Sequence, residues 1–213
     1  MKRFLLGASV LAIVVVALAQ FSHLGGPPDV MKLTAAEKAQ CGLSVAATEG
    51  PFYVSGTPAL VDGELNTANL PGQAISVSGH LYRGEVGTTP IANAKIEIWQ
   101  ADSSGSYHPN GNGDVAKYKA QDIALRGYVT TDESGAYHFT TIYPGEYTGR
   151  TRHIHFKISA ADRVLTTQLI IPSKTGDAIG FDQDTIAQGL PTCALLKFDE
   201  TTKPEAAQFD FRL

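Results

Sequence analysis

The sequence predicts an all-β fold: an antiparallel β-sandwich with long loops and a short N-terminal helix. From residue 73 onward, apolar and polar residues alternate in short runs bounded by turn residues, which is the pattern of half-buried strands. No stretch with a helical pattern of crossover length separates these runs, so a parallel sheet with helical connections is not expected. About seven or eight short strands in this arrangement are typical of a two-sheet sandwich.

The predicted strands follow one another along most of the chain. Their ranges are 75–83, 96–99, 127–131, 136–140, 153–158, 164–171 and 209–211. An Asp-Glu-Ser-Gly turn joins the third and fourth of these strands as a hairpin. Two long stretches rich in Gly, Asp, Asn and Pro lie at 101–124 and 172–194. Long loops on a rigid β scaffold are where sites are built, so we expect an active site there.

The first 47 residues are predicted to lie outside the sandwich. Residues 1–19 have the basic start, the apolar run and the small residues of a signal peptide, with cleavage after Ala19. An uncleaved N-terminal anchor is the alternative. Residues 20–47 form a linker and a short helix, which a capping-box pattern starts at Thr34. The domain at 48–213 is therefore expected to be exported, periplasmic or extracellular, and free of the membrane once the signal is cleaved.

The net charge and the two cysteines bear on the binding partners and on the redox state of the protein. The formal net charge is −4 and no run of Lys or Arg is present, which argues against a nucleic-acid partner. Cys41 and Cys193 lack the spacing of a zinc site or a redox motif. In an oxidising compartment a Cys41–Cys193 disulfide is the expected state, with two buried free thiols as the alternative.

The candidate metal ligands begin with His153-Ile154-His155. Residues two apart on a strand point to the same face, so both imidazoles can reach one point, although such a pair alone also fits a plain polar strand face. Tyr147 precedes the pair in a turn, and Tyr107 lies in the first long loop. Phenolate is a hard anionic ligand that suits Fe(III), and two neutral imidazoles complete the set. Tyrosine is not among the usual ligands of zinc.

Five sequence blocks stand in a distinctive order between residues 48 and 172. They are Thr-Glu-Gly-Pro-Phe-Tyr at 48–53, Glu-Ile-Trp-Gln-Ala-Asp at 97–102, Thr-Asp-Glu-Ser-Gly-Ala-Tyr at 131–137, Ile-Tyr-Pro-Gly-Glu-Tyr at 142–147 and Arg-His-Ile-His-Phe at 152–156. In this order and spacing the chain resembles the intradiol ring-cleavage dioxygenases, which include the protocatechuate, catechol and hydroxyquinol dioxygenases. Five blocks together are more specific than any single motif.

The resemblance implies a transthyretin-like or immunoglobulin-like sandwich that holds one Fe(III) per chain. It also implies cleavage of catechol-type rings by O2 between the two hydroxylated carbons, which gives cis,cis-muconate-type diacids. By position, the implied metal ligands are Tyr107, Tyr147, His153 and His155. Arg150 and Gln168 match catalytic residues near the substrate, and Tyr147 is also catalytic because it leaves the iron when substrate binds.

Several alternatives remain open. Tyr118 lies in the same loop as Tyr107 and is an alternative ligand, whereas His108 is expected beside the site rather than in it. Asp177, Asp182 and Asp184 form a dilute acidic loop without calcium-binding spacing. The sequence does not distinguish among catechol, hydroxyquinol, protocatechuate and a lignin-like phenol as the substrate. It is compatible with a homo-oligomer but does not specify one. The alternative function is an exported non-enzymatic β-sandwich binding module, which has no need of iron.

Overall fold

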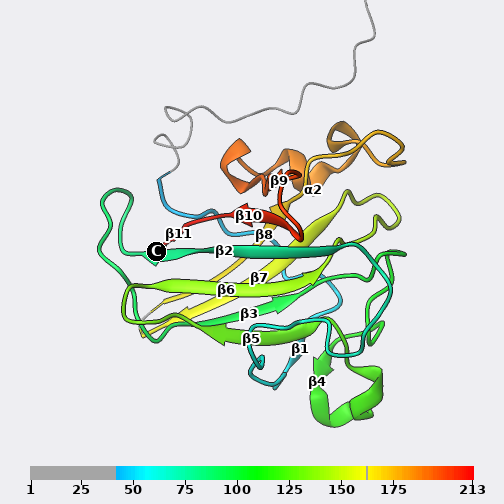
Figure 1. Ribbon diagram of the computed structural model, residues 1–213, viewed down its shortest axis with the longest axis horizontal. Helices are drawn as coiled ribbons and strands as arrows, with labels where there is room; N and C mark the ends of the chain where they lie inside the picture. Colours follow the sequence, from blue (N-terminus) through cyan, green and yellow to red (C-terminus); the bar gives the residue numbers. More distant parts are fainter. Residues whose placement is uncertain (1–41, 162) are drawn as a thin grey trace, which may run out of the picture.

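The computed structural model describes residues 42–161 and 163–213, and it shows two packed β-sheets with little helix (Figure 1). This arrangement confirms the predicted all-β fold. The predicted signal peptide, the short helix expected from Thr34 and Cys41 lie outside the described residues. In the described part of the chain, no helix is both long and apolar enough to cross a membrane.

One sheet has four strands in the order β5-β3-β7-β8, and every neighbouring pair is antiparallel. Its strands are β3 (Lys95–Trp99), β5 (Arg126–Thr130), β7 (His153–Ala160) and β8 (Arg163–Ile170). Four of the predicted strands correspond to these elements. The alternation of apolar and polar residues was therefore a sufficient guide to this sheet.

The second sheet is mixed rather than fully antiparallel. Its strands are β2 (Ala74–Tyr82), β6 (Ala136–Ile142), β9 (Phe198–Asp199), β10 (Glu205–Gln208) and β11 (Phe211–Arg212). β6 pairs antiparallel with β2, whereas β10 and β11 both run parallel to β2. This differs from the predicted antiparallel arrangement, because the C-terminal strands return to β2 through a long connection that imposes no hairpin.

The hydrophobic core lies between the two sheets. Alternate residues of β2 are buried, and the residues between them are partly exposed. Ile75 and Val77 of β2 belong to the same buried cluster as Ile154 and Phe156 of β7. Burying a side chain of this size contributes about 1.5–3 kcal/mol. The core therefore determines which face of β7 points to the second sheet, and the opposite face is available for a site.

The two predicted long loops contain short elements and reach the same end of the four-stranded sheet. The first loop contains β4 (Gly113–Asp114), η1 (Val115–Lys117) and η2 (Ala120–Asp122), and β4 pairs with β1 (Val54–Ser55). The second contains η3 (Phe181–Gln183), α2 (Thr185–Gln188) and η4 (Thr192–Ala194). β3 ends where β7 begins, so both loops border the start of β7.

The segment before β1 runs along the edge of β8. The backbone N–H of Ala47 donates to the carbonyl of Thr166 at 2.9 Å, and the hydroxyl of Thr167 donates to the carbonyl of Val45 at 2.7 Å. This pairing leads the following residues, 48–53, over the outer face of the four-stranded sheet. The first of the five sequence blocks thus covers the strand that carries the two histidines.

Candidate metal centre

Four donor atoms of tyrosine and histidine side chains meet on the outer face of the four-stranded sheet. The Nε2 atom of His155 lies 3.1 Å from Nε2 of His153 and 3.1 Å from Oη of Tyr107. The Nε2 atom of His153 lies 3.4 Å from Oη of Tyr107 and 3.3 Å from Oη of Tyr147. The structure therefore brings together the four side chains that the resemblance implies as metal ligands.

β7 presents both histidines on one face. His153 and His155 point away from the core, and Ile154 between them packs into it. The Nδ1–H of His153 donates to the carbonyl of Thr151 at 2.6 Å. Because a carbonyl can only accept, the proton is on Nδ1 and the lone pair of Nε2 faces the cluster. The ring of His155 is stacked on Trp99, with ring centroids 4.8 Å apart.

The two tyrosines differ in how firmly they are held. Tyr107 is only 4% exposed and stacks on Phe52, with ring centroids 4.3 Å apart. The guanidinium of Arg126 also lies over the Tyr107 ring, at 5.7 Å from its centroid. Tyr147 is half-buried and meets Tyr107 edge to face. Tyr107 is therefore fixed by packing, whereas Tyr147 sits on a turn with room to move.

Burial sets the charge state of the cluster. Burial, and then the positive charge of Arg150, lowers the pKa of His153 to about 3. Burial and the neighbouring His153 lower the pKa of His155 well below its usual value. Burial and the neighbouring Tyr147 raise the pKa of Tyr107 well above its usual value. Both imidazoles are thus neutral at ordinary pH and able to bind a cation, which would in turn favour the phenolate form of Tyr107.

The donor set fits a hard metal ion. In residues 42–161 and 163–213, no three His, Cys, Asp or Glu side chains gather into a group that could hold a metal. Any ion at this cluster would therefore depend on the phenol oxygens, which argues against a conventional zinc or calcium site. Donor atoms at about 2.0–2.2 Å from a common ion stand roughly 3–3.5 Å apart, as these atoms do. Two phenolates and two neutral imidazoles suit Fe(III).

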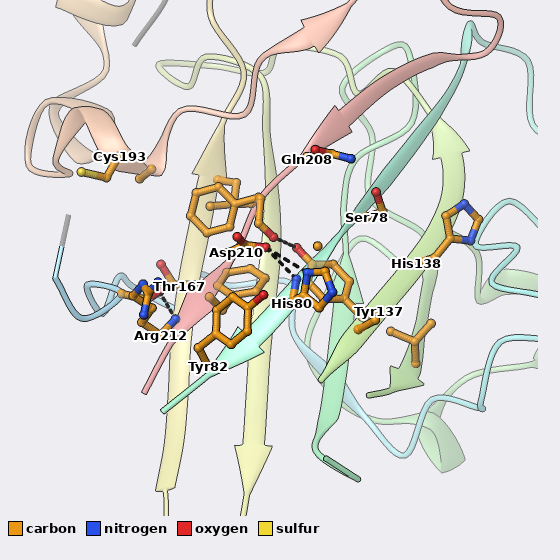
Figure 2. Close-up of a pocket in the computed structure, with 18 of the residues that line it drawn as sticks. Ser78, His80, Tyr82, Tyr137, His138, Thr167, Cys193, Gln208, Asp210 and Arg212 are labelled. Carbon is orange, nitrogen blue, oxygen red and sulfur yellow. Dashed lines mark hydrogen bonds and ion pairs between the residues drawn. The ribbon is translucent and has the colours of Figure 1, made fainter. Parts of the chain in front are cut away.

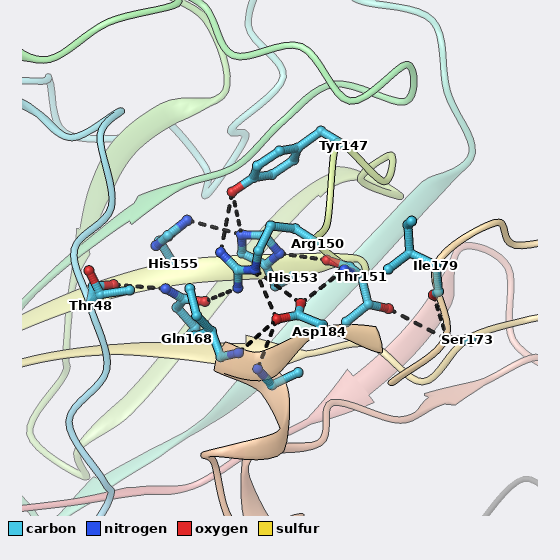
Figure 3. A network of polar contacts seen from close by, with 12 residues as sticks. Thr48, Tyr147, Arg150, Thr151, His153, His155, Gln168, Ser173, Ile179 and Asp184 are labelled. Carbon is cyan, nitrogen blue, oxygen red and sulfur yellow. Dashed lines mark hydrogen bonds and ion pairs between the residues drawn. The ribbon is translucent and has the colours of Figure 1, made fainter. Parts of the chain in front are cut away.

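A polar network lies directly beside the cluster (Figure 3). The Nη1 atom of Arg150 donates to Oη of Tyr147 at 3.3 Å, and its Nη2 atom donates to Oε1 of Gln168 at 2.6 Å. The Nε atom of Arg150 donates to the carboxylate of Asp184 at 3.0 Å. Gln168 also donates from Nε2 to the carbonyl of Thr48 at 2.7 Å. The two residues predicted to be catalytic beside Tyr147 are therefore hydrogen-bonded to each other.

A row of opposite residues across the sheet forms the floor of the site. Trp99 is directly opposite both Arg126 and His155, and His155 is opposite Gln168. Residues that face each other on neighbouring strands point to the same side of a sheet. Neither Trp99 nor Arg126 was predicted to belong to the site. The register between strands, which alternation within one strand does not show, is the signal that relates them to the site.

Arg126 connects the loops on either side of the cluster. Its guanidinium donates to the carbonyls of Phe52, His108 at 2.6 Å and Pro109 at 2.9 Å. Burial lowers its pKa to about 10, so the side chain is still charged at neutral pH. The contact ties residues 48–53 to the loop that follows β3. Both segments supply aromatic rings that surround the donor atoms.

The alternative loop residues lie outside the cluster. The Oη atom of Tyr118 donates to the carbonyl of Asn112 at 2.7 Å. The Nε2 atom of His108 lies 2.7 Å from a carboxylate oxygen of Asp102. Neither side chain shares a contact with the four donor atoms among the interactions of the described residues. Of the two tyrosines in the loop, Tyr107 is thus the one that the fold directs into the site.

A large pocket of about 1400 Å³ lies elsewhere in the molecule (Figure 2). His80 and Asp210 form part of its wall, and the backbone N–H of His80 donates to the Asp210 carboxylate at 2.8 Å. Tyr82 stacks on His80, and Arg212 lies over the Tyr82 ring. None of the four donor residues lines this pocket. The pocket is therefore separate from the candidate metal centre.

Fold and site together define a class: a β-sandwich protein with a cluster of two tyrosines and two histidines on the outer face of one sheet. Residues 48–213 of the chain match the model of a protein family named Dioxygenase. Relatives with curated names agree with this match. The chain belongs to the intradiol ring-cleavage dioxygenases, as the five sequence blocks indicated.

Two curated relatives illustrate the similarity. The chain is 31% identical over 198 residues to a catechol 1,2-dioxygenase of Acinetobacter baylyi, covering 80% of this chain and 59% of that protein. It is 30% identical over 161 residues to a protocatechuate 3,4-dioxygenase beta chain of Burkholderia cepacia, covering 66% of this chain and 63% of that protein. The matched part of the chain covers 44% to 63% of the length of these and other curated relatives.

Solved structures show the same fold. The dioxygenase domain of a dioxygenase–carbohydrate-binding protein fusion from Streptomyces sp. SirexAA-E superposes with a TM-score of 0.64 at 30% identity, covering 80% of this chain and 97% of that chain. An intradiol ring-cleavage dioxygenase from Tetranychus urticae superposes with a TM-score of 0.69 at 22% identity, covering 81% of this chain and 94% of that chain. The second comparison supports the fold alone.

Proposed function

We propose that this protein uses one Fe(III) per chain to cleave catechol-type diols with O2 between the two hydroxylated carbons. The products would be cis,cis-muconate-type diacids. The observation that carries the proposal is the convergence of two phenol oxygens and two imidazole nitrogens at separations of 3.1–3.4 Å. Membership of the intradiol dioxygenases supports the same reaction class.

The ion would be held by the four residues of the cluster, Tyr107, Tyr147, His153 and His155. When bound there, Fe(III) would supply a Lewis acid that binds both oxygens of the diol and makes the ring reactive toward O2. The neutral imidazoles need no deprotonation before binding, because burial already lowers the pKa of both. The apolar surroundings limit access of bulk water to the reacting atoms.

Tyr147 is the residue suited to move a proton. It is half-buried on a turn, whereas Tyr107 is packed between Phe52 and the sheet. As a phenolate, Oη of Tyr147 would take a proton from one diol hydroxyl and turn away from the cluster. Arg150 would stabilise that oxygen before it moves, since Nη1 of Arg150 already donates to it.

Arg150 and Gln168 would act on the substrate together. The guanidinium carries a fixed positive charge next to the position that Tyr147 occupies, so it would stabilise negative charge that develops on the ring. Gln168 accepts from Arg150 and donates to the carbonyl of Thr48, which fixes its amide. The pair thus presents a preformed electrostatic environment and requires little rearrangement when substrate binds.

The loop at 48–53 would cover the site, since Phe52 contacts the rings of both Tyr107 and Tyr147. Gly50 has a φ of +73°, and a Cβ atom at this position would lie 3.4 Å from Cε1 of His155. Phe52 follows and stacks on Tyr107. The positive φ explains why a glycine stands two residues before Phe52, because side chains with a Cβ atom rarely adopt this backbone conformation.

Oxygen consumption with a panel of diols tests the proposed reaction. Iron-loaded protein is expected to consume O2 with catechol, hydroxyquinol or protocatechuate and to release the corresponding ring-opened diacid, detectable by mass spectrometry. A hydroquinone with para hydroxyls is the control, since it cannot present two adjacent oxygens to one ion. A folded, iron-containing protein that converts none of the three diols would contradict the proposal and favour the non-enzymatic binding module.

We also propose that the protein is exported and that Cys41 pairs with Cys193. The basic start and apolar run of residues 1–19 support export, and Cys193 lies in η4 at the surface of the second long loop. The mass of the mature protein under non-reducing and reducing conditions tests both points. We expect loss of the first 19 residues and a mass increase of about 2 Da on reduction, equal to the two hydrogens gained when one disulfide opens.

A further inference from the structure

The carboxylate of Asp184 is fully buried beside the polar network, although it lies 34 residues from Arg150 in the sequence. Its two oxygens accept from Nε of Arg150 at 3.1 and 3.0 Å. Oδ1 also accepts from the backbone N–H groups of Ile186 and Ala187 at 3.0 Å each, and Oδ2 accepts from the backbone N–H of Thr151 at 2.9 Å. A carboxylate with this many donors has a single well-defined position.

The contact with Asp184 completes the set of partners around Arg150. One edge of the guanidinium faces Asp184, and the two terminal nitrogens face Tyr147 and Gln168. Figure 3 shows these side chains pointing toward one another from β8, from the turn before β7 and from the residue that caps the start of α2. Without the carboxylate, a long flexible side chain would retain only its contacts with two groups that themselves face the substrate.

Asp184 also connects the second long loop to the start of β7. It is the N-cap of α2, because it accepts from the first backbone N–H groups of that helix. It accepts from the backbone N–H of Thr151, and the carbonyl of the same residue accepts from Nδ1–H of His153. One side chain thus connects the residue that follows Arg150 to the start of α2. Burial by itself raises the pKa of this carboxyl, but the N–H of Ala187 and the charge of Arg150 hold the pKa below its usual value.

We propose that Asp184 is a positioning residue that holds the guanidinium of Arg150 against Tyr147 and Gln168 in the orientation needed for ring cleavage. The inference rests on the proposed function, in which Arg150 faces the reacting diol. Asp184 itself touches neither the four donor atoms nor the space in front of them. Its effect on turnover is therefore transmitted through Arg150.

The same loop provides a matched control. Asp177 pairs with Arg152, with its Oδ1 atom 2.7 Å from Nη2, and it accepts from the backbone N–H of Lys174 at 2.7 Å. Like Asp184, it is a largely buried carboxylate with an arginine and a backbone partner. Arg152, however, donates to the carbonyl of Pro144 and not to the cluster. Asp177→Asn removes the same kind of ion pair without affecting Arg150.

The decisive experiment is a double-variant cycle measured with catechol, or with whichever diol of the panel the wild type converts. Asp184→Asn is expected to keep iron and to lower kcat by about 10- to 100-fold, the usual cost of losing an outer partner of a metal-site residue. Asp177→Asn is expected to stay within about twofold of wild type. In the Arg150→Gln background, Asp184→Asn should cause no more than about a twofold further loss, because the residue through which it acts is already gone.

The inference would be overturned if the loss of kcat in the double variant equalled the product of the losses in Asp184→Asn and Arg150→Gln. An unchanged kcat in Asp184→Asn would also overturn it. If Asp184→Asn does not fold, Asp184→Ser serves instead, since serine can still cap α2 but cannot pair with Arg150. Crystal structures of the variants supply a readout that does not depend on turnover. We expect the Arg150 guanidinium to lose its contacts with Tyr147 and Gln168 in the Asp184 variants and to keep them in Asp177→Asn.

These experiments distinguish a failure of the proposed ring cleavage from a failure of the positioning role of Asp184. A wild type that converts no diol would contradict the proposed function, and the crystal structures would still decide whether Asp184 positions Arg150. A wild type that is active, together with an Asp184→Asn variant whose Arg150 is unmoved, would refute the positioning role alone.

Discussion

The two faces of β7 are both buried, yet burial has opposite energetic consequences on them. The inner face carries Ile154 and Phe156, which pack into the core between the sheets. The outer face carries His153 and His155, whose burial lowers the pKa of each imidazole. Burying apolar groups stabilises the fold, whereas burying polar rings costs free energy unless a partner compensates. One strand thus stabilises the fold with one set of side chains and carries the proposed metal ligands with the other.

The outer face of β7 also carries a buried polar atom without a hydrogen-bond partner among the described residues, whereas Ile154 and Phe156 on the inner face have no polar side-chain atoms. The Nδ1 atom of His155 is buried and has no hydrogen-bond partner among the described residues. Its ring is held by stacking on Trp99 rather than by a hydrogen bond. A buried polar atom without a partner costs free energy of folding, so stability alone would favour an apolar residue at this position.

The largest effects are expected from removing a ligand on the outer face. Tyr107→Phe and His155→Ala should each lose iron, the visible phenolate-to-Fe(III) absorption and all measurable ring cleavage. Both variants should remain folded, because the inner face of β7 is unchanged. Metal analysis, the visible spectrum and circular dichroism check this prediction. Retention of iron and colour in both variants would show that the ligands are assigned wrongly.

Removal of a large side chain on the inner face should reverse this pattern. Phe156→Ala is expected to lower the free energy of unfolding by about 3–5 kcal/mol, because it removes a fully buried ring and leaves a cavity. The folded fraction should still bind iron. Urea denaturation of the metal-free proteins measures the change, and His155→Ala should destabilise less than Phe156→Ala. An equal loss in both variants would remove the energetic contrast between the two faces.

Loss of the cation next to the outer face should affect turnover without affecting metal binding. Arg150→Ala is expected to retain iron and to lower kcat by about 10²-fold, in line with removal of one electrostatic stabiliser of the transition state. Steady-state kinetics and iron content check this together. Arg163→Ala, at the exposed start of β8, is the control and should change kcat little. An unchanged kcat in Arg150→Ala would exclude its proposed role.

The pH dependence of the free energy of unfolding should show that burying the imidazole of His153 disfavours its protonated form. The pKa of His153 is lowered from 6.5 to about 3 in the folded protein, so the unfolded chain binds more protons between these pH values. The free energy of unfolding of the metal-free protein should therefore fall as pH decreases from 6.5 toward 3, by up to about 1.4 kcal/mol per pH unit for this group. His153→Asn should show a shallower slope by this amount. Equal slopes in the two proteins would show that burial does not lower the pKa of His153.

Sequence patterns identified the sandwich where alternation is local. The runs that became β2, β6 and β7 were readable because one face of each is apolar, and the same alternation placed His153 and His155 on one side. The parallel pairing of β10 and β11 with β2 was not predictable, since it depends on a long connection rather than on local residues. The alternation of residues along the chain therefore predicts where strands lie better than it predicts which strands pair and in which direction.

The same division applies to the site. Tyr107, Tyr147 and the two histidines came together as the family resemblance implied, whereas Trp99, Arg126 and Asp184 were missed. Trp99 and Arg126 join the site through the register of neighbouring strands. Asp184 reaches Arg150 from a separate loop, and in the sequence it looked like one of several dispersed acidic residues. Supporting residues of this kind become visible only when the fold brings distant segments into contact.

The central claim is that two tyrosines and two histidines hold a single ferric ion on the outer face of β7. Iron content and the visible spectrum of the purified, unreduced wild-type protein test it most directly. We predict one iron per chain and a phenolate-to-Fe(III) band that disappears in Tyr107→Phe. A folded protein that takes up no iron when Fe(III) or Fe(II) with O2 is supplied, or that binds iron without any such band, would contradict the account.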